Sequence, residues 1–255
     1  TLITALAIIF IIGYILIKGV PNLSADLFSL KYSSANQSML PSIINTVYLT
    51  ALTLLLAVPV GVFSAIYLVE YARKSSFFVK IINVANETLS GIPSIVYGLF
   101  GFLAFVISKK WGYSLLAGVI TLAIMVLPLI IRTSQEAMLG VDNSFREASY
   151  GLGAGKLRTV FKIVLPSAMP GILSGVILAI GRIVGETAAL IYTAGTVPEA
   201  ATSLTSSSRT ISVHLYCLLN EGLYTEQAYA TAVVLIIFVV IINALSNFLA
   251  KKIIK

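Results

Sequence analysis

The stretch Ile43–Tyr71 reads IINTVYLTALTLLLAVPVGVFSAIYLVEY and carries a single charged residue, Glu70, near its end. A helix needs about 20 consecutive, mostly apolar residues to cross the hydrocarbon core of a bilayer. This stretch is therefore long enough to cross a membrane and either to tilt or to extend past it. Because backbone groups in lipid require internal hydrogen bonds, a helix is the expected form.

Five more apolar blocks of similar character occur along the chain. The 255 residues are 58% hydrophobic and only 11% charged, whereas soluble domains carry about 25% charged residues. This composition argues against a soluble helical domain. It predicts an all-α, polytopic membrane protein in which residues 1–255 form one transmembrane domain with about six spans. The other five predicted spans are Leu2–Lys18, Leu89–Ile107, Ser114–Ile131, Ala168–Ala194 and Ala228–Leu249.

The first of these blocks follows directly on Thr1, which we interpret as a truncated or processed start. The block has no small-residue cleavage site, so we expect a retained helix rather than a signal peptide.

The net charge of +7 is explained by orientation in the membrane, without any need for nucleic acid. Cytoplasmic loops of membrane proteins are enriched in Lys and Arg. Three segments, after the second, fourth and sixth spans, hold eleven basic residues, and the alternate segments hold five. We therefore expect a multi-pass protein of the cell membrane, surrounded by lipid, with both ends in the cytoplasm. The eleven are Arg73, Lys74, Lys80, Arg132, Arg146, Lys156, Arg158, Lys162, Lys251, Lys252 and Lys255, and the five are Lys18, Lys31, Lys109, Lys110 and Arg209.

The longest predicted external segment is Thr196–Gln227. It is expected to be a flexible or re-entrant connector, or else a docking surface for an external partner. Its one histidine, His214, is expected to be a polar loop residue. With Cys217 as the only cysteine, neither an internal disulfide nor a thiolate metal cage can form, and no metal site is predicted.

The predicted cytoplasmic loop, residues 132–166, contains signals for two short helices. Ser144 and Glu147 have the spacing of a capping box, which predicts a helix from about Phe145. Three glycines, at positions 151, 153 and 155, then end or bend it. A second stretch carries apolar residues at the i, i+3, i+4, i+7 spacing of an amphipathic helix, which is expected to lie along the membrane surface until Leu165 and Pro166 break the chain. These apolar residues are Leu157, Val160, Phe161 and Val164.

Such a loop is either an interfacial element without a partner or a lever held by a cytoplasmic partner. Its residues resemble the EAA loop of ABC importer permeases in every spacing, with Ser149 as the one departure. The resemblance implies a type I permease fold and a coupling helix that sits in a groove of a separate ATPase subunit. We attribute the glycine to a sharp angle between helices, which a side chain at Gly153 would obstruct. The matching residues are Glu147, Ala148, Ser149, Gly153, Ile163, Leu165 and Pro166.

The chain is predicted to be a transporter subunit rather than an enzyme. It has no G-x-x-x-x-G-K-[ST] phosphate-binding loop, so ATP and Mg are expected on the ATPase chain, and no cofactor is expected on this one. A secondary transporter would need ion-coupling carboxylates in several spans. An intramembrane enzyme would need a nucleophile paired with a base. Neither pattern is evident.

Arg182 and Glu186 are ionisable residues inside the fifth predicted span. Such residues are costly there, roughly 2.5–3.5 kcal/mol at a helix centre on insertion scales. Their spacing places them on one face of a helix, either as a structural ion pair or as a pair lining a translocation pathway. The arginine fork is suited to meeting an anion.

Three segments resemble phosphate importer permeases, of the PstA type with the PstC type as a near alternative. Gly181–Ala189 is similar to their G-E-T-A segment, Gly91–Gly98 to G-I-P-S-I-V-Y-G, and Ala65–Tyr71 to A-I-Y-L-x-E-Y. The resemblance implies transport of inorganic phosphate, with related oxyanions such as molybdate or sulfate as the alternative. It also implies three kinds of partner: a second homologous permease, an ATPase dimer and an external phosphate-binding protein. Arg182, Glu186 and Thr187 would then belong to the translocation pathway.

The third predicted span contains Gly91, Pro93 and Ser94. A proline inside a span usually produces a kink with no special role. The three residues together also suit a local break at which backbone groups face the pathway.

Overall fold

The computed structural model describes residues 2–73 and 76–254, which contain helices and no strand. Lys74 and Lys255, which entered the orientation argument, lie outside the described residues. The chain divides into two compact units, and four long helices contribute residues to both. Unit 1 comprises Thr1–Ala51, Ser94–Thr121 and Val184–Ile242, and unit 2 comprises Leu52–Pro93, Leu122–Ile183 and Asn243–Lys255.

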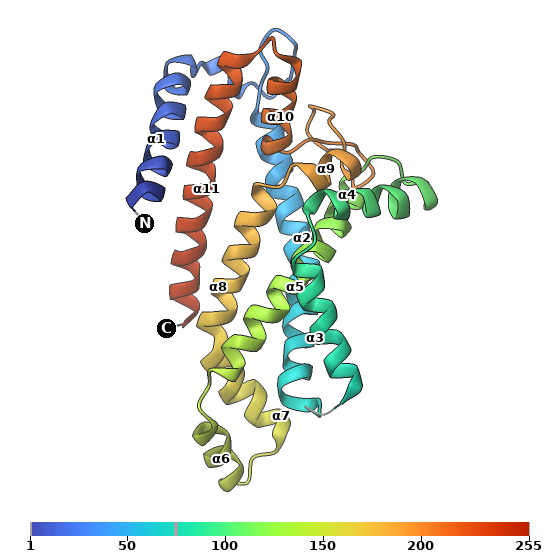
Figure 1. The fold of residues 1–255 in the computed structure, drawn as a ribbon, viewed down its shortest axis with the longest axis vertical. Helices are drawn as coiled ribbons and strands as arrows, with labels where there is room; N and C mark the ends of the chain where they lie inside the picture. Colours follow the sequence, from blue (N-terminus) through green and yellow to red (C-terminus); the bar gives the residue numbers. More distant parts are fainter. Residues whose placement is uncertain (1, 74–75, 255) are drawn as a thin grey trace. The chain divides into compact units, whose positions relative to one another are not determined.

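Five described helices are long and apolar enough to cross a membrane, and α3 followed by α4 makes a sixth if the two form one broken span. The expectation of about six spans is thereby confirmed. The five are α1 (Leu2–Gly19), α2 (Leu40–Ile66), α5 (Leu115–Leu139), α8 (Leu165–Val184) and α11 (Thr225–Ile254). The shorter helices are α3 (Phe77–Ser90), α4 (Ser94–Gly101), α6 (Asn143–Gly151), α7 (Lys156–Thr159), α9 (Ala188–Thr193) and α10 (Ile211–Glu221) (Figure 1).

Three of these helices continue through π-helical turns. α2 extends through Tyr67–Tyr71 and α4 through Phe102–Ser108. The turn Val160–Val164 joins α7 directly to α8. Short 3-10 turns, Val20–Asn22 and Ala25–Phe28, lie between α1 and α2.

Three predicted spans had wrong boundaries. The predicted span Ser114–Ile131 ends too early, since α5 continues to Leu139. The predicted span Leu89–Ile107 begins too late, since α3, the first part of that broken span, begins at Phe77.

The predicted span Leu89–Ile107 is also interrupted after Ser90, because Pro93 lacks an N–H and disfavours helical backbone in the residue before it. The predicted span Ala168–Ala194 ends early, since α8 stops at Val184 and α9 is a separate short helix.

Most of the exposed side chains of α1 are apolar, with Leu2 at 73%, Ile3 at 83% and Phe10 at 72% exposure. A contiguous apolar surface of this kind is rare on soluble monomers. It matches a helix whose surroundings are lipid or neighbouring helices.

In unit 1, α4 and α9 lie side by side (Figure 1). A Cβ atom at Gly98 of α4 would lie 2.8 Å from the Ala189 Cα of α9, so glycine is required for this close approach. A separate buried cluster joins α10 and α11 to the segment before α2, and consists of Leu27, Met39, Ile211 and Ala230.

The segment after α9 is more ordered than a flexible connector. The Asn45 side chain of α2 holds it, donating to the Glu199 carbonyl at 2.9 Å and accepting from the Ala201 N–H at 2.8 Å. Further along, the Thr210 side chain caps α10 by accepting from the Val213 N–H. His214 lies within α10 with no exposed surface, so the expectation of a polar loop residue was wrong.

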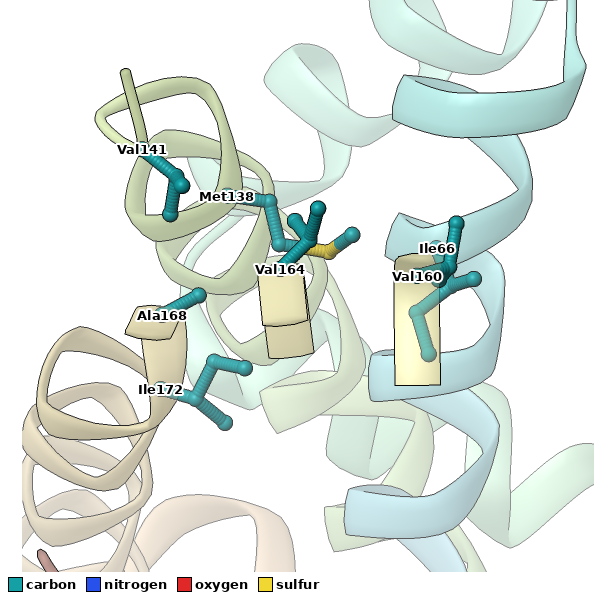
Figure 2. Close-up of a cluster of buried hydrophobic side chains, with 7 residues drawn as sticks. All are labelled: Ile66, Met138, Val141, Val160, Val164, Ala168 and Ile172. Atoms are coloured by element: carbon teal, nitrogen blue, oxygen red, sulfur yellow. The ribbon is translucent and has the colours of Figure 1, made fainter. Parts of the chain in front are cut away.

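In unit 2, a buried apolar cluster is shared by the end of α2, the end of α5 with Val141 just after it, the π turn Val160–Val164 and the start of α8. Figure 2 shows these side chains, which converge from all of these segments. Burying aliphatic groups of this size stabilises packing by roughly 1.5–3 kcal/mol per side chain. The cluster comprises Ile66, Met138, Val141, Val160, Val164, Ala168 and Ile172.

Candidate functional site

The helix of the predicted coupling loop, α6, begins earlier than expected and has a different cap. Asp142 is the N-cap residue, and its carboxylate accepts a 2.8 Å hydrogen bond from the Ser144 N–H. This bond lowers the pKa of Asp142 below its ordinary value. Asp at the N-cap satisfies one of the free N–H groups of the first turn. The predicted capping box with Ser144 as cap was therefore wrong, since Asp142 takes that position.

The corner after α6 depends on the backbone of Gly153. Its φ is +81°, in the left-handed region that residues with a Cβ avoid at a cost of about 1–2 kcal/mol. Its N–H donates to the Tyr150 carbonyl at 2.9 Å, which closes the turn. A Cβ atom there would meet nothing within 4 Å. Our reason for this glycine was therefore wrong, because the requirement is conformational and not one of space.

The two arms of the corner are joined by a buried hydroxyl pair. Ser149 of α6 and Thr159 of α7 approach to 2.8 Å between their hydroxyl oxygens, and both side chains are buried. The Thr159 hydroxyl also donates to the Gly155 carbonyl at 3.2 Å, which leaves Ser149 as the donor between the hydroxyls. Ser149, the one departure from the EAA pattern, is thus accounted for by a contact that alanine cannot make.

The second arm does not lie apart from the span that follows it. α7, the π turn and α8 run without interruption from Lys156 to Val184, so the predicted break at Leu165 and Pro166 was wrong. The Leu165 N–H donates to the Val160 carbonyl five residues back. This wider turn lets the helix pass the Pro166 ring, which in a regular helix clashes with the carbonyl four residues earlier. Ile163 is half-buried, and Leu165 packs against the cluster of Figure 2.

Arg146 fastens α6 to the rest of unit 2. Its guanidinium donates to Glu70 Oε1 from Nη2 at 2.8 Å and from Nε at 3.1 Å. It also donates to the backbone carbonyls of Val141 at 2.8 Å and Met138 at 3.0 Å, at the end of α5. The side chains of Arg146 and Glu70 are 13% and 7% exposed, so this is a largely buried ion pair. Sequence reasoning treated Arg146 only as an orientation charge.

The outer face of α6 is left open in the chain. Glu147 and Ala148 are exposed, and Phe145, Tyr150 and Leu152 are 55%, 42% and 89% exposed. A short helix with exposed aromatic groups, held rigidly from behind, is suited to insertion into a groove of another protein.

Arg182 and Glu186 do not share a helical face as predicted. Arg182 lies in the last turn of α8, partly exposed, and α8 ends two residues before Glu186. Glu186 is buried, and its Oε1 accepts from the Ala189 N–H of α9 at 3.0 Å. Its carbonyl accepts from the Ser212 hydroxyl at 2.8 Å. Glu186 therefore satisfies a free N–H in the first turn of α9, with Thr187 as the residue before that helix.

The predicted break at residues 91–94 is present. Gly91 ends α3, where its N–H donates to the Thr88 carbonyl, and Ser94 begins α4. Pro93 lies between the two helices.

A polar groove in unit 2 was missed by sequence reasoning. It has a volume of about 320 Å³ between α3 and α5. The signal was available, because Asn83, Asn86 and Glu87 follow the i, i+3, i+4 spacing of one helical face. Across from them lie Arg132, Gln135 and Glu136, with Arg132 Nε 3.0 Å from Glu136 Oε1.

Comparison with known proteins places this arrangement in a family. Residues 57–255 match the family described as "Binding-protein-dependent transport system inner membrane component". The chain is 32% identical to the probable ABC transporter permease protein YqgI of Bacillus subtilis, over 99% of this chain and 92% of that protein. It is 37% identical to the phosphate transport system permease protein PstA 2 of Mycobacterium bovis, over 83% of this chain and 72% of that protein.

Solved structures show the same fold at low sequence identity. A bacterial alginate ABC transporter in complex with an alginate-bound periplasmic protein aligns over all of this chain and 95% of its own, with a TM-score of 0.70 and 17% identity. The MetNI methionine ABC transporter in an inward-facing conformation aligns over 84% of this chain and 93% of its own, with a TM-score of 0.63 and 17% identity. The fold is thus that of type I ABC importer permeases. With a family match over most of its length, an all-helical fold and the EAA loop in place, this chain belongs to the inner membrane components of binding-protein-dependent transport systems, as the permease subunit of an ABC importer.

Proposed function

We propose that this chain is the PstA-type permease of an ATP-driven phosphate importer. Three segments that resemble phosphate permeases, together with PstA relatives at 33–37% identity, support phosphate as the substrate. In this proposal the chain pairs with a second homologous permease. An ATPase dimer that holds ATP and Mg acts from the cytoplasm, and a phosphate-binding protein delivers the substrate from outside.

The observation that carries this proposal is the rigid path from α6 to α8. α6, the Gly153 corner, α7 and residues 165–183 of α8 all lie in unit 2. Arg146 and the Ser149–Thr159 pair fix α6 at one end, and helix continuity carries α7 into α8. A partner that grips the exposed face of α6 would therefore move α8 without a flexible link between them.

In this proposal the ATPase dimer lies on the same side of the membrane as α6. The excess of basic residues after the second, fourth and sixth predicted spans supports a cytoplasmic location for that side. Both ends of the chain are then cytoplasmic.

Arg182 stands at the end of the same rigid path. In this proposal its guanidinium meets the anion during translocation, because a partly exposed arginine in a span is costly unless it serves the pathway. In the same proposal Glu186 and Thr187, which precede α9, and the break at Gly91, Pro93 and Ser94 also belong to the translocation pathway.

A pair of glycine variants tests the coupling role. Gly151 and Gly153 both have open space where a Cβ would go, but only Gly153 has positive φ. Gly153→Ala should reduce [³²P]phosphate uptake and co-purification of the ATPase, while Gly151→Ala should leave both near wild type. Equal behaviour of the two variants in these assays, with both chains present in the membrane, would count against the coupling role.

Substrate and pathway are tested by competition and by Arg182 variants. Unlabelled phosphate should suppress labelled uptake at far lower concentrations than sulfate or molybdate. Arg182→Gln should abolish uptake in a complex that still assembles, and Arg182→Lys should retain part of it. Wild-type uptake by Arg182→Gln would leave the residue a structural role only.

A further inference from the structure

Unit 1 contains a buried arginine that has no acidic partner within ion-pair distance among the described residues. Arg209 is only 4% exposed and lies just before α10. Its backbone is held on both sides, with its N–H donating to the Val197 carbonyl at 2.9 Å and its carbonyl accepting from Asn45 Nδ2 at 3.2 Å. The side chain is therefore directed inward by a fixed backbone.

The guanidinium lies against an aromatic wall. Its central carbon is 4.8 Å from the centre of the Tyr32 ring, a cation–π contact. On the same ring, His214 packs edge-on with 6.4 Å between ring centres. Tyr32 is itself held by its hydroxyl, which donates to Gln37 Oε1 at 2.8 Å. Arg209 and His214 are thus both buried against Tyr32, close enough for the charge of Arg209 to act on the imidazole.

Both groups have unused hydrogen-bonding atoms. Arg209 Nε and Nη2 are buried and have no partner within the described chain, and the same is true of both ring nitrogens of His214. The Nε and Nη2 N–H groups point the same way from one edge of the guanidinium, which is the fork that binds two oxygens of a carboxylate or phosphate. Buried polar groups in native proteins almost always have partners, and a buried cation is especially costly without an anion.

We propose that Arg209 and His214 form a buried binding site for an oxyanion of the phosphate class, with the Arg209 fork holding two oxygens and the imidazole donating to a third. This site does not include Arg182, and it goes beyond the proposed function because the path from α6 to α8 contains neither of its residues. The chemistry fits a free phosphate ion or the phosphate of a lipid headgroup equally well.

His214 is suited to this role as a neutral group. Burial, with the positive charge of Arg209 as the next cause, lowers its pKa to about 3. The backbone of Gln37 opposes that shift slightly, although neither ring nitrogen meets it with hydrogen-bond geometry. A neutral imidazole donates one N–H without adding a second buried cation. Burial raises the pKa of the Cys217 thiol, while the charge of Arg209 and a contact between these two side chains oppose that shift, and Glu221 nearby is exposed.

The test is phosphate-dependent stability of the purified, detergent-solubilised transporter without its binding protein. Inorganic phosphate, titrated against chloride at equal ionic strength, should raise the melting temperature of the wild type. Arg209→Gln and Arg209→Lys should each weaken the apparent affinity at least tenfold, since neither side chain offers the fork. His214→Phe should weaken it less. Lys109→Gln, which removes the same charge from an exposed position of the same unit, should behave as wild type.

The outcomes separate this site from the coupling proposal. Gly153→Ala should lose uptake yet keep the phosphate-dependent stabilisation, so failure of one proposal leaves the other standing. If anionic phospholipid in nanodiscs stabilises wild type but not Arg209→Lys, and free phosphate has no effect, the site binds a lipid headgroup. The proposal is overturned if phosphate and anionic phospholipid each stabilise the wild type and Arg209→Lys equally. It is also overturned if neither ligand stabilises either protein.

Discussion

Replacing Arg146 by methionine should cost far more stability than the loss of one ion pair on a surface. The substitution removes the donor to Glu70 and to the carbonyls of Met138 and Val141. It leaves the Glu70 carboxylate, whose side chain is only 7% exposed, without its cation. Breaking a buried pair on one side costs about 3–5 kcal/mol. In a chain of this size that corresponds to a fall in melting temperature of roughly 6–20 °C.

The double variant gives the sharper test, because Glu70→Met should destabilise the wild type but stabilise the Arg146→Met variant. Much of the cost of Arg146→Met arises from the orphaned carboxylate, so adding Glu70→Met should restore part of the stability. The double variant should therefore melt above the Arg146→Met single variant. Additive losses, with the double variant melting below both singles, would refute the reasoning.

The assay needs a matched control and a functional readout. Arg132→Met breaks the exposed Arg132–Glu136 pair, whose side chains are 61% and 62% exposed, and should change the melting temperature little. In the assembled transporter, Arg146→Met should also weaken association with the ATPase, because α6 loses its attachment to α2 and α5. If Arg146→Met lowered the melting temperature no more than Arg132→Met does, the Arg146–Glu70 pair would not be what fixes α6.

Three further predictions concern single side chains. The free energy of unfolding in phosphate-free buffer should fall by about 2 kcal/mol as the pH drops from 7 to 5, because His214 becomes protonated in the unfolded chain below about pH 6.5 but stays neutral in the folded chain, where its pKa is about 3. The melting temperature of His214→Gln should therefore depend less on pH than that of the wild type. Ser149→Ala should lower the melting temperature by the equivalent of about 0.5–1.5 kcal/mol through the lost hydrogen bond to Thr159, whose hydroxyl keeps its bond to the Gly155 carbonyl. Once Thr159→Val has removed the acceptor, Ser149→Ala should cost less than it does in the wild type. Gly98→Val should prevent the close approach of α4 and α9, measured as loss of the folded protein in fluorescence-detected size-exclusion chromatography, whereas Gly13→Val, at an open position on α1, should elute as wild type does.

The features that sequence predicted best are those that depend on short, local patterns. Apolar length alone located α1, α2, α11 and the start of α5 to within about five residues, because lipid imposes a single requirement on such blocks. The glycine corner after α6 was likewise predicted, since positive φ is a property of one residue. Its cap was assigned wrongly because Asp142 and Ser144 are both good N-cap residues, and only the backbone decides between them.

The features that were missed depend on residues far apart in the chain. The Arg146–Glu70 pair joins residues 76 positions apart, and no periodicity in either segment predicts it. Arg182 and Glu186 show the opposite error, since a regular spacing was taken as a shared face although the helix ends between them. Periodicity states where residues would lie if a helix continued, and it carries no information on whether the helix does continue. Gly185 was the available signal, because glycine is common where helices end.

Arg209 shows why charge in a membrane protein has to be interpreted from burial as well as from position. In the sequence, Arg209 is one of the five basic residues on the proposed external side. Only its positive charge enters the prediction of orientation, and an exposed lysine would contribute the same charge. Its burial against Tyr32 changes that interpretation, because orientation requires no buried charge and a surface cation would be less costly. Either an anion or a structural need keeps this arginine inside, and Arg209→Lys separates the two. Lysine retains the charge and lacks the fork, so a structural cation tolerates it and an oxyanion site does not.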